Sequence, residues 1–124
     1  MILTLSQVAL GGAIGASLRY LTNVGAMRLF GPGFPVATLI VNVLGSFLMG
    51  VIVVVLGKKG GNYLAPLLMT GILGGFTTFS AFSLDTLTLW ERGEHGLAFG
   101  YVTASVILSL AAIAAGLFVA RNLI

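Results

Sequence analysis

The sequence contains very few charged side chains and no cysteine. Only 7% of its 124 residues are charged, six of them basic and three acidic, whereas a soluble domain carries roughly 25%. So few charges cannot cover the surface of a soluble protein of this length. The absence of cysteine excludes disulfides, thiolate chemistry and cysteine-based metal sites. The composition therefore predicts a protein whose solvent is lipid.

Residues that would support catalysis or nucleic-acid binding are also missing. The sequence has no histidine and carboxylate cluster with metal-ligand spacing, no nucleophile beside a base and no phosphate-binding loop, so we do not expect an enzyme. The net charge of +3 is too sparse for a nucleic-acid surface. The opening residues, MILTLSQVAL, lack the basic start of a signal peptide and are predicted to begin the first membrane span.

Four long apolar segments make up most of the sequence. A helix needs about 20 mostly apolar residues to cross a bilayer. Spans are predicted at about residues 2–26, 36–56, 63–89 and 97–120, and the connections are short and carry turn signals. Tyr63 and Trp90 are expected to anchor the third span at the interfaces. The sequence thus predicts an all-α, multi-pass protein of the cell inner (plasma) membrane, with residues 1–124 forming a single transmembrane domain.

Small residues recur at a spacing that favours close helix contacts. The pairs that stand four apart are Gly11 and Gly15, Ser46 and Gly50, and Gly71 and Gly75. Small side chains at this spacing allow two helix backbones to approach each other in lipid. We therefore predict a tightly packed helix bundle.

The distribution of basic residues gives no preferred orientation in the membrane. The basic residues divide into Lys58, Lys59 and Arg121 on the side of the N-terminus and Arg19, Arg28 and Arg92 on the other side. Positive charge normally marks the cytoplasmic side, so this balance leaves two alternatives. Either other forces fix one orientation, or copies insert both ways and pair antiparallel. Because four spans alone enclose little space, a dimer is also attractive on grounds of size.

No ionisable residue is expected in the central two-thirds of any span. Arg19 and Asp85 both lie toward predicted span ends, and His95 lies in a polar loop. An arginine at the end of a span usually extends its side chain to the interface, and Asp85 is predicted to be a solvated or paired boundary residue. A proton-coupled transporter usually needs an ionisable group at depth, so proton coupling is not expected.

The polar residues predicted at depth are neutral. Asn42 lies near the middle of the second span, and Thr38 shares its helix face one turn away. In the fourth span Tyr101, Ser105 and Ser109 recur every four residues and form a stripe of hydroxyls. A buried serine often bonds the carbonyl one turn back. A buried amide is costly unless it is satisfied, so Asn42 is predicted to mark a pathway.

The third span contains the segment GILGGFTTFSAF, in which two adjacent glycines are predicted to break the helix. Phe79 and Phe82 follow this break on one helix face. The rim of an aromatic ring carries partial positive charge. Ring edges, the Asn42 amide and the hydroxyls could together replace the hydration of an anion without a full charge that would trap it. These residues therefore predict an anion path.

These motifs resemble the Fluc (CrcB-type) family of fluoride channels. The matching segments are GGAIGASLRY at 11–20, PVATLIVNVLGSFLMG at 35–50, GILGGFTTFSAFS at 71–83, and the Tyr101, Ser105 and Ser109 stripe. They cover all four spans. The resemblance implies a passive fluoride-selective channel that exports cytoplasmic fluoride, built as an antiparallel, dual-topology homodimer with a break in the third helix.

The resemblance also implies roles for individual residues. Backbone carbonyls of Gly74 and Thr77 would hold a structural Na+ at the dimer centre, and Arg19 would lie near an aqueous vestibule. The fluoride pathway would be lined by Phe79, Phe82, Asn42, Thr38, Tyr101, Ser105 and Ser109. The expected partners are fluoride, a second copy of the chain and the lipid bilayer.

Two other functions remain open from the sequence. A small dual-topology exporter of cationic drugs would share the size, span number and charge balance, but it would need an acidic residue in the first span, and residues 2–18 contain none. The other alternative is a non-transporting membrane scaffold whose polar residues only join helices. Flux through the purified protein in liposomes distinguishes all three.

Overall fold

The computed structural model describes all residues from Met1 to Ile124 and contains no strand. Four helical stretches are long and apolar enough to cross a membrane, and they are Ile2–Phe30, Val36–Lys59, Asn62–Glu91 and His95–Leu123. The prediction of an all-α protein with four spans is confirmed. The first, second and fourth helices extend beyond the predicted spans at their C-terminal ends, where they end with basic residues in their last turns. Positive charge is favourable at a helix C-terminus, so the charges that end the apolar runs do not end the helices.

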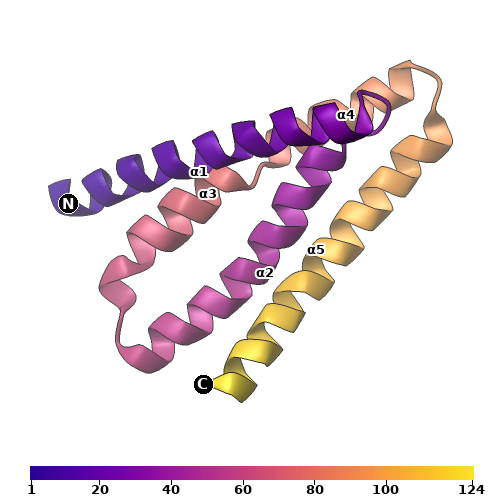
Figure 1. Cartoon of the computed structure of the whole chain (residues 1–124). Coiled ribbons are helices and arrows are strands. Elements are labelled where there is room, and N and C mark those ends of the chain that lie inside the picture. Colours follow the sequence, from indigo (N-terminus) through magenta and orange to yellow (C-terminus); the bar gives the residue numbers. More distant parts are fainter.

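The spans run alternately up and down between two ends of the molecule. Helix α1 (Ile2–Phe30), helix α2 (Val36–Lys59) and helix α5 (His95–Leu123) are continuous. Both termini and the connection after α2 lie toward one end, and the connections before α2 and before α5 lie at the other (Figure 1). Helix α5 packs mainly along α2, and α1 packs mainly against the first half of the third span.

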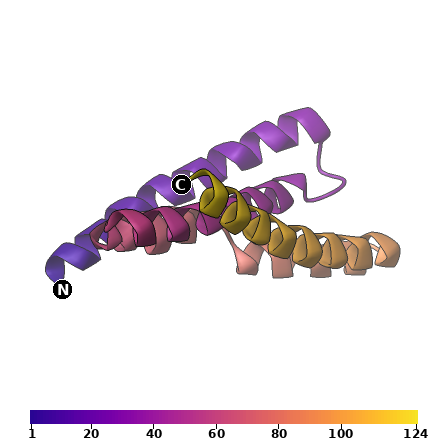
Figure 2. The same cartoon turned by 90° about the horizontal axis from the view of Figure 1, so that it is seen from below.

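A single chain does not form a closed bundle. No contact joins α1 to α5, and Figure 2 shows α1 inclined to the other spans. Only 18 of the 124 residues are buried, so most of the apolar surface is available to lipid or to another chain. The predicted tight bundle is therefore realised only as pairs of closely packed helices.

The third span is divided into several pieces. It contains a 3₁₀ turn η1 (Asn62–Leu64), a π-helical segment η2 (Pro66–Leu73), a short helix α3 (Gly74–Phe76) and helix α4 (Phe79–Glu91). Thr77 and Thr78 have extended backbone, with φ/ψ of −83°/158° and −155°/124°. The first half of the span packs on α1, and α4 packs on α5. The break therefore allows one span to change its packing partner halfway across.

The break predicted in the third helix is present, but it begins at Thr77, two residues after the glycine pair. Gly74 has helical dihedral angles, φ −63° and ψ −36°, and the helix ends only at the two threonines. A glycine is needed here for a reason other than breaking the helix. A Cβ on Gly75 would lie 2.8 Å from the carbonyl oxygen of Gly12 in α1, so Gly75 provides close helix contact. The prediction of close contacts at small residues is confirmed at this crossing.

The pairing of α2 with α5 also depends on glycine. A Cβ on Gly116 would overlap the carbonyl oxygen of Phe47, whereas a Cβ on Gly100 in the same helix would meet no atom within 4 Å. We expect Gly116→Ala to lower the free energy of unfolding by about 1–3 kcal/mol through overpacking. Gly100→Ala is the matched control and should be neutral or slightly stabilising, since alanine favours helix by up to about 1 kcal/mol. Thermal unfolding of both purified variants checks this, and equal midpoints would contradict it.

Candidate functional site

A groove of about 420 Å³ lies beside the break in the third span. It brings together five of the residues that the sequence predicted to line an anion path, and these are Asn42, Phe79, Phe82, Ser105 and Ser109. They come from α2, α4 and α5. Thr77 and Thr78, the two residues of the break, also line the groove. Three separate elements thus deliver neutral polar groups and aromatic rings to one space.

Asn42 binds the backbone of the break. Its Nδ2 donates to the carbonyl oxygen of Thr78 at 3.0 Å, and its Oδ1 accepts from the Thr78 N–H at 2.8 Å. Both groups are backbone polar groups that the break removes from helical pairing. Unpaired backbone groups are costly in lipid, so Asn42 stabilises the interruption. One Nδ2 hydrogen stays free of this pairing, so the predicted donation to an anion is still chemically available.

Arg19 lies further from the end of its helix than the sequence predicted. Since α1 continues to Phe30, Arg19 is an interior residue of a span and not an end residue. Its Nε donates to the carbonyl oxygen of Gly75 at 3.0 Å, next to the break. Arg19 thus contacts the third span beside the break and does not lie in the last turn of its helix. Arg19 also lines neither of the two main cavities.

The two phenylalanines lie side by side at the start of α4. Their ring centroids are 5.4 Å apart with an interplanar angle of 45°. Phe79 is 77% exposed in the single chain, while Phe82 packs against the Tyr101 ring at 5.3 Å. The single chain therefore leaves the Phe79 side of the groove uncovered.

Ser105 has an unpaired hydroxyl in this groove. Several other hydroxyls in the spans donate to the carbonyl one turn back, as those of Ser6 and Ser17 do. Ser105 is only 6% exposed, and its Oγ has no hydrogen-bond partner. Because a buried hydroxyl without a partner is costly, its donor is free for a group that occupies the groove.

The start of α4 adds positive potential near the same space. Thr78 caps the helix, since its Oγ1 accepts from the Ala81 N–H at 3.1 Å. A helix N-terminus carries partial positive charge from its unpaired N–H groups. The break therefore places a helix N-terminus within the membrane, beside the groove that Phe79 lines.

The Gly74 and Thr77 backbone was predicted to hold a cation. The carbonyl oxygen of Thr77 accepts no backbone hydrogen bond, and its hydroxyl is used in donation to the Leu73 carbonyl. No group of three or more histidine, aspartate or glutamate side chains could hold a metal elsewhere. A free carbonyl fits a hard cation that prefers oxygen ligands.

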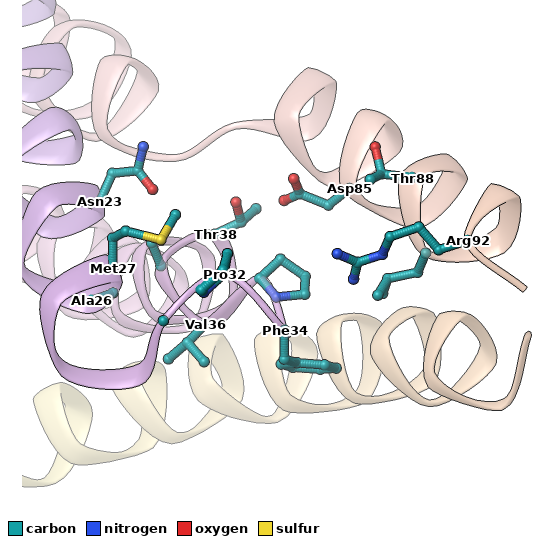
Figure 3. Close-up of a pocket in the computed structure, with 14 residues that line it drawn as sticks. Asn23, Ala26, Met27, Pro32, Phe34, Val36, Thr38, Asp85, Thr88 and Arg92 are labelled. Atoms are coloured by element: carbon teal, nitrogen blue, oxygen red, sulfur yellow. The ribbon is translucent and has the colours of Figure 1, made fainter. Parts of the chain in front are cut away.

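A second, smaller cavity of about 140 Å³ lies beside the connection before α2. Figure 3 shows Asn23, Thr38, Asp85, Thr88 and Arg92 around it. Thr38 lines this cavity and not the groove, although it lies one turn from Asn42 on α2. The two residues thus share a face of α2, as predicted, but line different cavities.

Two residues of the site were missed by the sequence interpretation. Thr78 supplies both the cap of α4 and the backbone partner of Asn42, and threonine before a helix start is a recognisable capping signal. Asp85 was predicted to be a solvated or paired boundary residue, and its carboxylate accepts a hydrogen bond from the Tyr101 hydroxyl at 3.1 Å. No local pattern predicts that pairing, because the two residues lie in different helices.

Comparisons with known proteins agree with the motifs. The family model described as "CrcB-like protein, Camphor Resistance (CrcB)" matches residues 6–117. A protein of Cereibacter sphaeroides named "Fluoride-specific ion channel FluC" is 71% identical over 122 residues, which is 98% of each chain. Proteins with the same name from Paracoccus denitrificans and a Ruegeria species are 60% and 57% identical over 120 and 125 residues. They cover 97% and 100% of this chain and 96% and 99% of their own. The four-span chain with its interrupted third helix therefore belongs to the CrcB family.

Proposed function

We propose that this protein is a passive, fluoride-selective channel that lets fluoride leave the cytoplasm and so relieves fluoride toxicity. The observation that carries the proposal is the full-length identity, 71% at its highest among the relatives given above, to proteins named as fluoride-specific ion channels. The groove supports it, since it gathers neutral donors and aromatic rings with no nucleophile or metal cluster. The proposal is therefore of a channel and not of an enzyme.

Acid–base chemistry and the membrane potential supply the driving force. Hydrogen fluoride crosses membranes as a neutral acid and ionises in a less acidic cytoplasm. A passive pore then lets the negative interior of the cell expel the anion across the plasma membrane. The drive is about 2.3 kcal/mol per charge for each 100 mV. No coupling ion is needed for export.

The residues of the groove would take over part of the hydration of the ion. Ser105 has a free hydroxyl, and Asn42 retains one amide hydrogen after binding Thr78. Phe79 and Phe82 would present ring edges, which carry partial positive charge. Ser109 lies one turn beyond Ser105 and extends the polar track. A set of neutral donors favours passage because no full positive charge holds the anion.

The uncovered side of the groove supports an antiparallel, dual-topology homodimer. Phe79 is 77% exposed in a single chain, and an ion path open to lipid on one side would not conduct. A second copy would close it. With Arg19 now inside a span, the basic residues at the two ends are three against two, so neither orientation is strongly favoured.

A structural Na+ at the centre of this dimer is part of the proposal. The free Thr77 carbonyl and the neighbouring Gly74 would supply oxygen ligands from each copy. Interrupted membrane helices bind small cations through such carbonyls. A cation that binds only the assembled dimer would stabilise it by mass action.

Fluoride efflux from liposomes tests the proposed function. Vesicles loaded with potassium fluoride and containing the purified protein should release fluoride when a potassium ionophore balances the charge, and hardly at all without it. No stoichiometric sodium movement should accompany the release. Proton-coupled drug uptake would favour the exporter instead, and the absence of any flux would favour the scaffold.

Dual topology gives a separate prediction. The chain has no cysteine, so one cysteine can be placed in the connection after α2 at Gly60. This residue is exposed, and its φ is positive. Asparagine, which tolerates this backbone conformation, serves there as the structural control. An impermeant thiol reagent applied to intact cells should label about half of the protein under equal insertion. Complete labelling, or labelling only after lysis, would show a single orientation.

A further inference from the structure

Tyr101 lies between two aromatic rings, each of which lines one of the two cavities. Its side chain has 0% exposure, and it contacts one aromatic ring from each cavity. Phe34, which lines the smaller cavity, meets it edge-on with centroids 5.5 Å apart, and Phe82, which lines the groove, lies at 5.3 Å. Tyr101 therefore connects the linings of the two cavities through its ring contacts.

The Tyr101 hydroxyl is held by Asp85. The hydroxyl donates to Asp85 Oδ2 at 3.1 Å, and a tyrosine hydroxyl has only one hydrogen to donate. While Asp85 accepts that hydrogen, the remaining lone pairs of the oxygen repel an anion. An anion that accepts a hydrogen bond from Tyr101 must therefore compete with a carboxylate for the same donor.

The charge of Asp85 is not cancelled by a neighbour. The nearby Arg92 donates to the Gly33 carbonyl at 2.8 Å and pairs with Glu94 at 3.0 Å. Asp85 itself forms no ion pair, and Figure 3 shows its carboxylate directed into the smaller cavity toward Thr38 and Asn23. A hydrogen bond to a carboxylate is roughly twice as strong as one between neutral groups.

Anions differ in how well they can compete for this donor. Fluoride is small and concentrates its charge, so it is a much stronger hydrogen-bond acceptor than chloride. An anion that accepts strongly can draw the Tyr101 hydroxyl away from Asp85, while a weak acceptor meets lone pairs and a carboxylate. The pair therefore acts as a filter on acceptor strength.

From this geometry we propose that Asp85 is a selectivity-determining positioning residue, which acts through Tyr101 and rests on the proposed fluoride function. Asp85 occupies the hydroxyl hydrogen of Tyr101, and only an anion that accepts hydrogen bonds strongly can take that hydrogen bond from it. Removal of the carboxylate charge lowers the barrier for weak acceptors more than for fluoride. The expected consequence is a change in anion preference and not a change in fold.

Asp85→Asn tests the proposal, with Glu91→Gln as the matched control. Asparagine has the shape of aspartate and can still accept from the Tyr101 hydroxyl, but the bond becomes neutral. Glu91 is the last residue of the same helix, six residues after Asp85, is exposed and lines neither cavity. Glu91→Gln therefore removes one negative charge without touching the tyrosine. The measurement is the ratio of chloride efflux to fluoride efflux from liposomes.

The ratio should rise at least tenfold in Asp85→Asn and stay at the parental value in Glu91→Gln. A parental ratio in Asp85→Asn, or an equal rise in both variants, overturns the proposal. If Asp85→Asn does not fold, Tyr101→Phe keeps the ring and removes the hydroxyl donor. The ratio of chloride efflux to fluoride efflux should then rise, because fluoride no longer gains the hydrogen bond from Tyr101. An unchanged ratio there would also overturn it. A parent that conducts no fluoride would instead refute the proposed function.

Discussion

Replacing Phe79 or Phe82 with isoleucine is expected to slow fluoride flux about a hundredfold while the protein stays folded. Isoleucine keeps an apolar side chain of roughly similar volume, which usually costs less than about 1.5 kcal/mol of stability. It removes the positive ring rim that faces the anion. A loss of about 2.7 kcal/mol of stabilisation at the barrier corresponds to a hundredfold slower passage.

Phe118 provides the control for this pair. It is 68% exposed in α5, comparable to Phe79 at 77%, and it lies outside the groove. Phe118→Ile should leave the fluoride efflux rate within about twofold of the parent, since the ring that it removes does not line the groove. Parental rates in both Phe79→Ile and Phe82→Ile would make the phenylalanines packing residues and would remove the groove from the ion path.

The spans were predictable from sequence because lipid selects for composition over long segments. Runs of apolar residues placed all four helices correctly, and small residues four apart identified the contact of α1 with the third span. The helix ends were less predictable. The C-terminal turns of α1, α2 and α5 carry basic residues, which end an apolar run without ending a helix.

The break illustrates what local propensity cannot determine. Adjacent glycines suggested an interruption at Gly74 and Gly75, but the helix continues through them. Small residues are needed at Gly75 because the third span packs closely on α1 there. The chain becomes extended only at Thr77 and Thr78, where Asn42 supplies the replacement partners. That partner lies 36 residues away in sequence. A tertiary hydrogen bond therefore decides where the helix ends.

The contact that Arg19 makes was not predictable for the same reason. A charge near the end of an apolar run usually reaches the interface, and the sequence gives no sign of an acceptor at depth. The structure supplies one, since the Gly75 carbonyl accepts from Arg19 Nε. By contrast, the residues of the groove were predictable, because helical spacing alone places Ser105 and Ser109 on one face.

Asn42→Leu is expected to destabilise the protein and abolish measurable fluoride flux. Leucine has the same branched arrangement of side-chain heavy atoms as asparagine but leaves both the N–H and the C=O of Thr78 without their partners, which lie at 2.8 and 3.0 Å in the parent. Each unsatisfied buried group costs about 1–3 kcal/mol, so the free energy of unfolding should fall by several kcal/mol. Thermal unfolding and liposome efflux are measured on the same preparation.

The two measurements separate the two roles that Asn42 combines. Ser46 lies one turn further along α2 and lines the same groove, but it holds no part of the break, so Ser46→Ala should retain parental stability. An Asn42→Leu protein that is as stable as the parent but does not conduct would show that Asn42 only binds the ion. The break would then not depend on the hydrogen bonds from Asn42 to the Thr78 backbone. A protein that loses stability and still conducts would show that Asn42 stabilises the break and does not bind the ion. Loss of flux at a temperature at which the less stable variant is still folded is expected if Asn42 also faces the path, because the Thr78 backbone and the anion then depend on one amide.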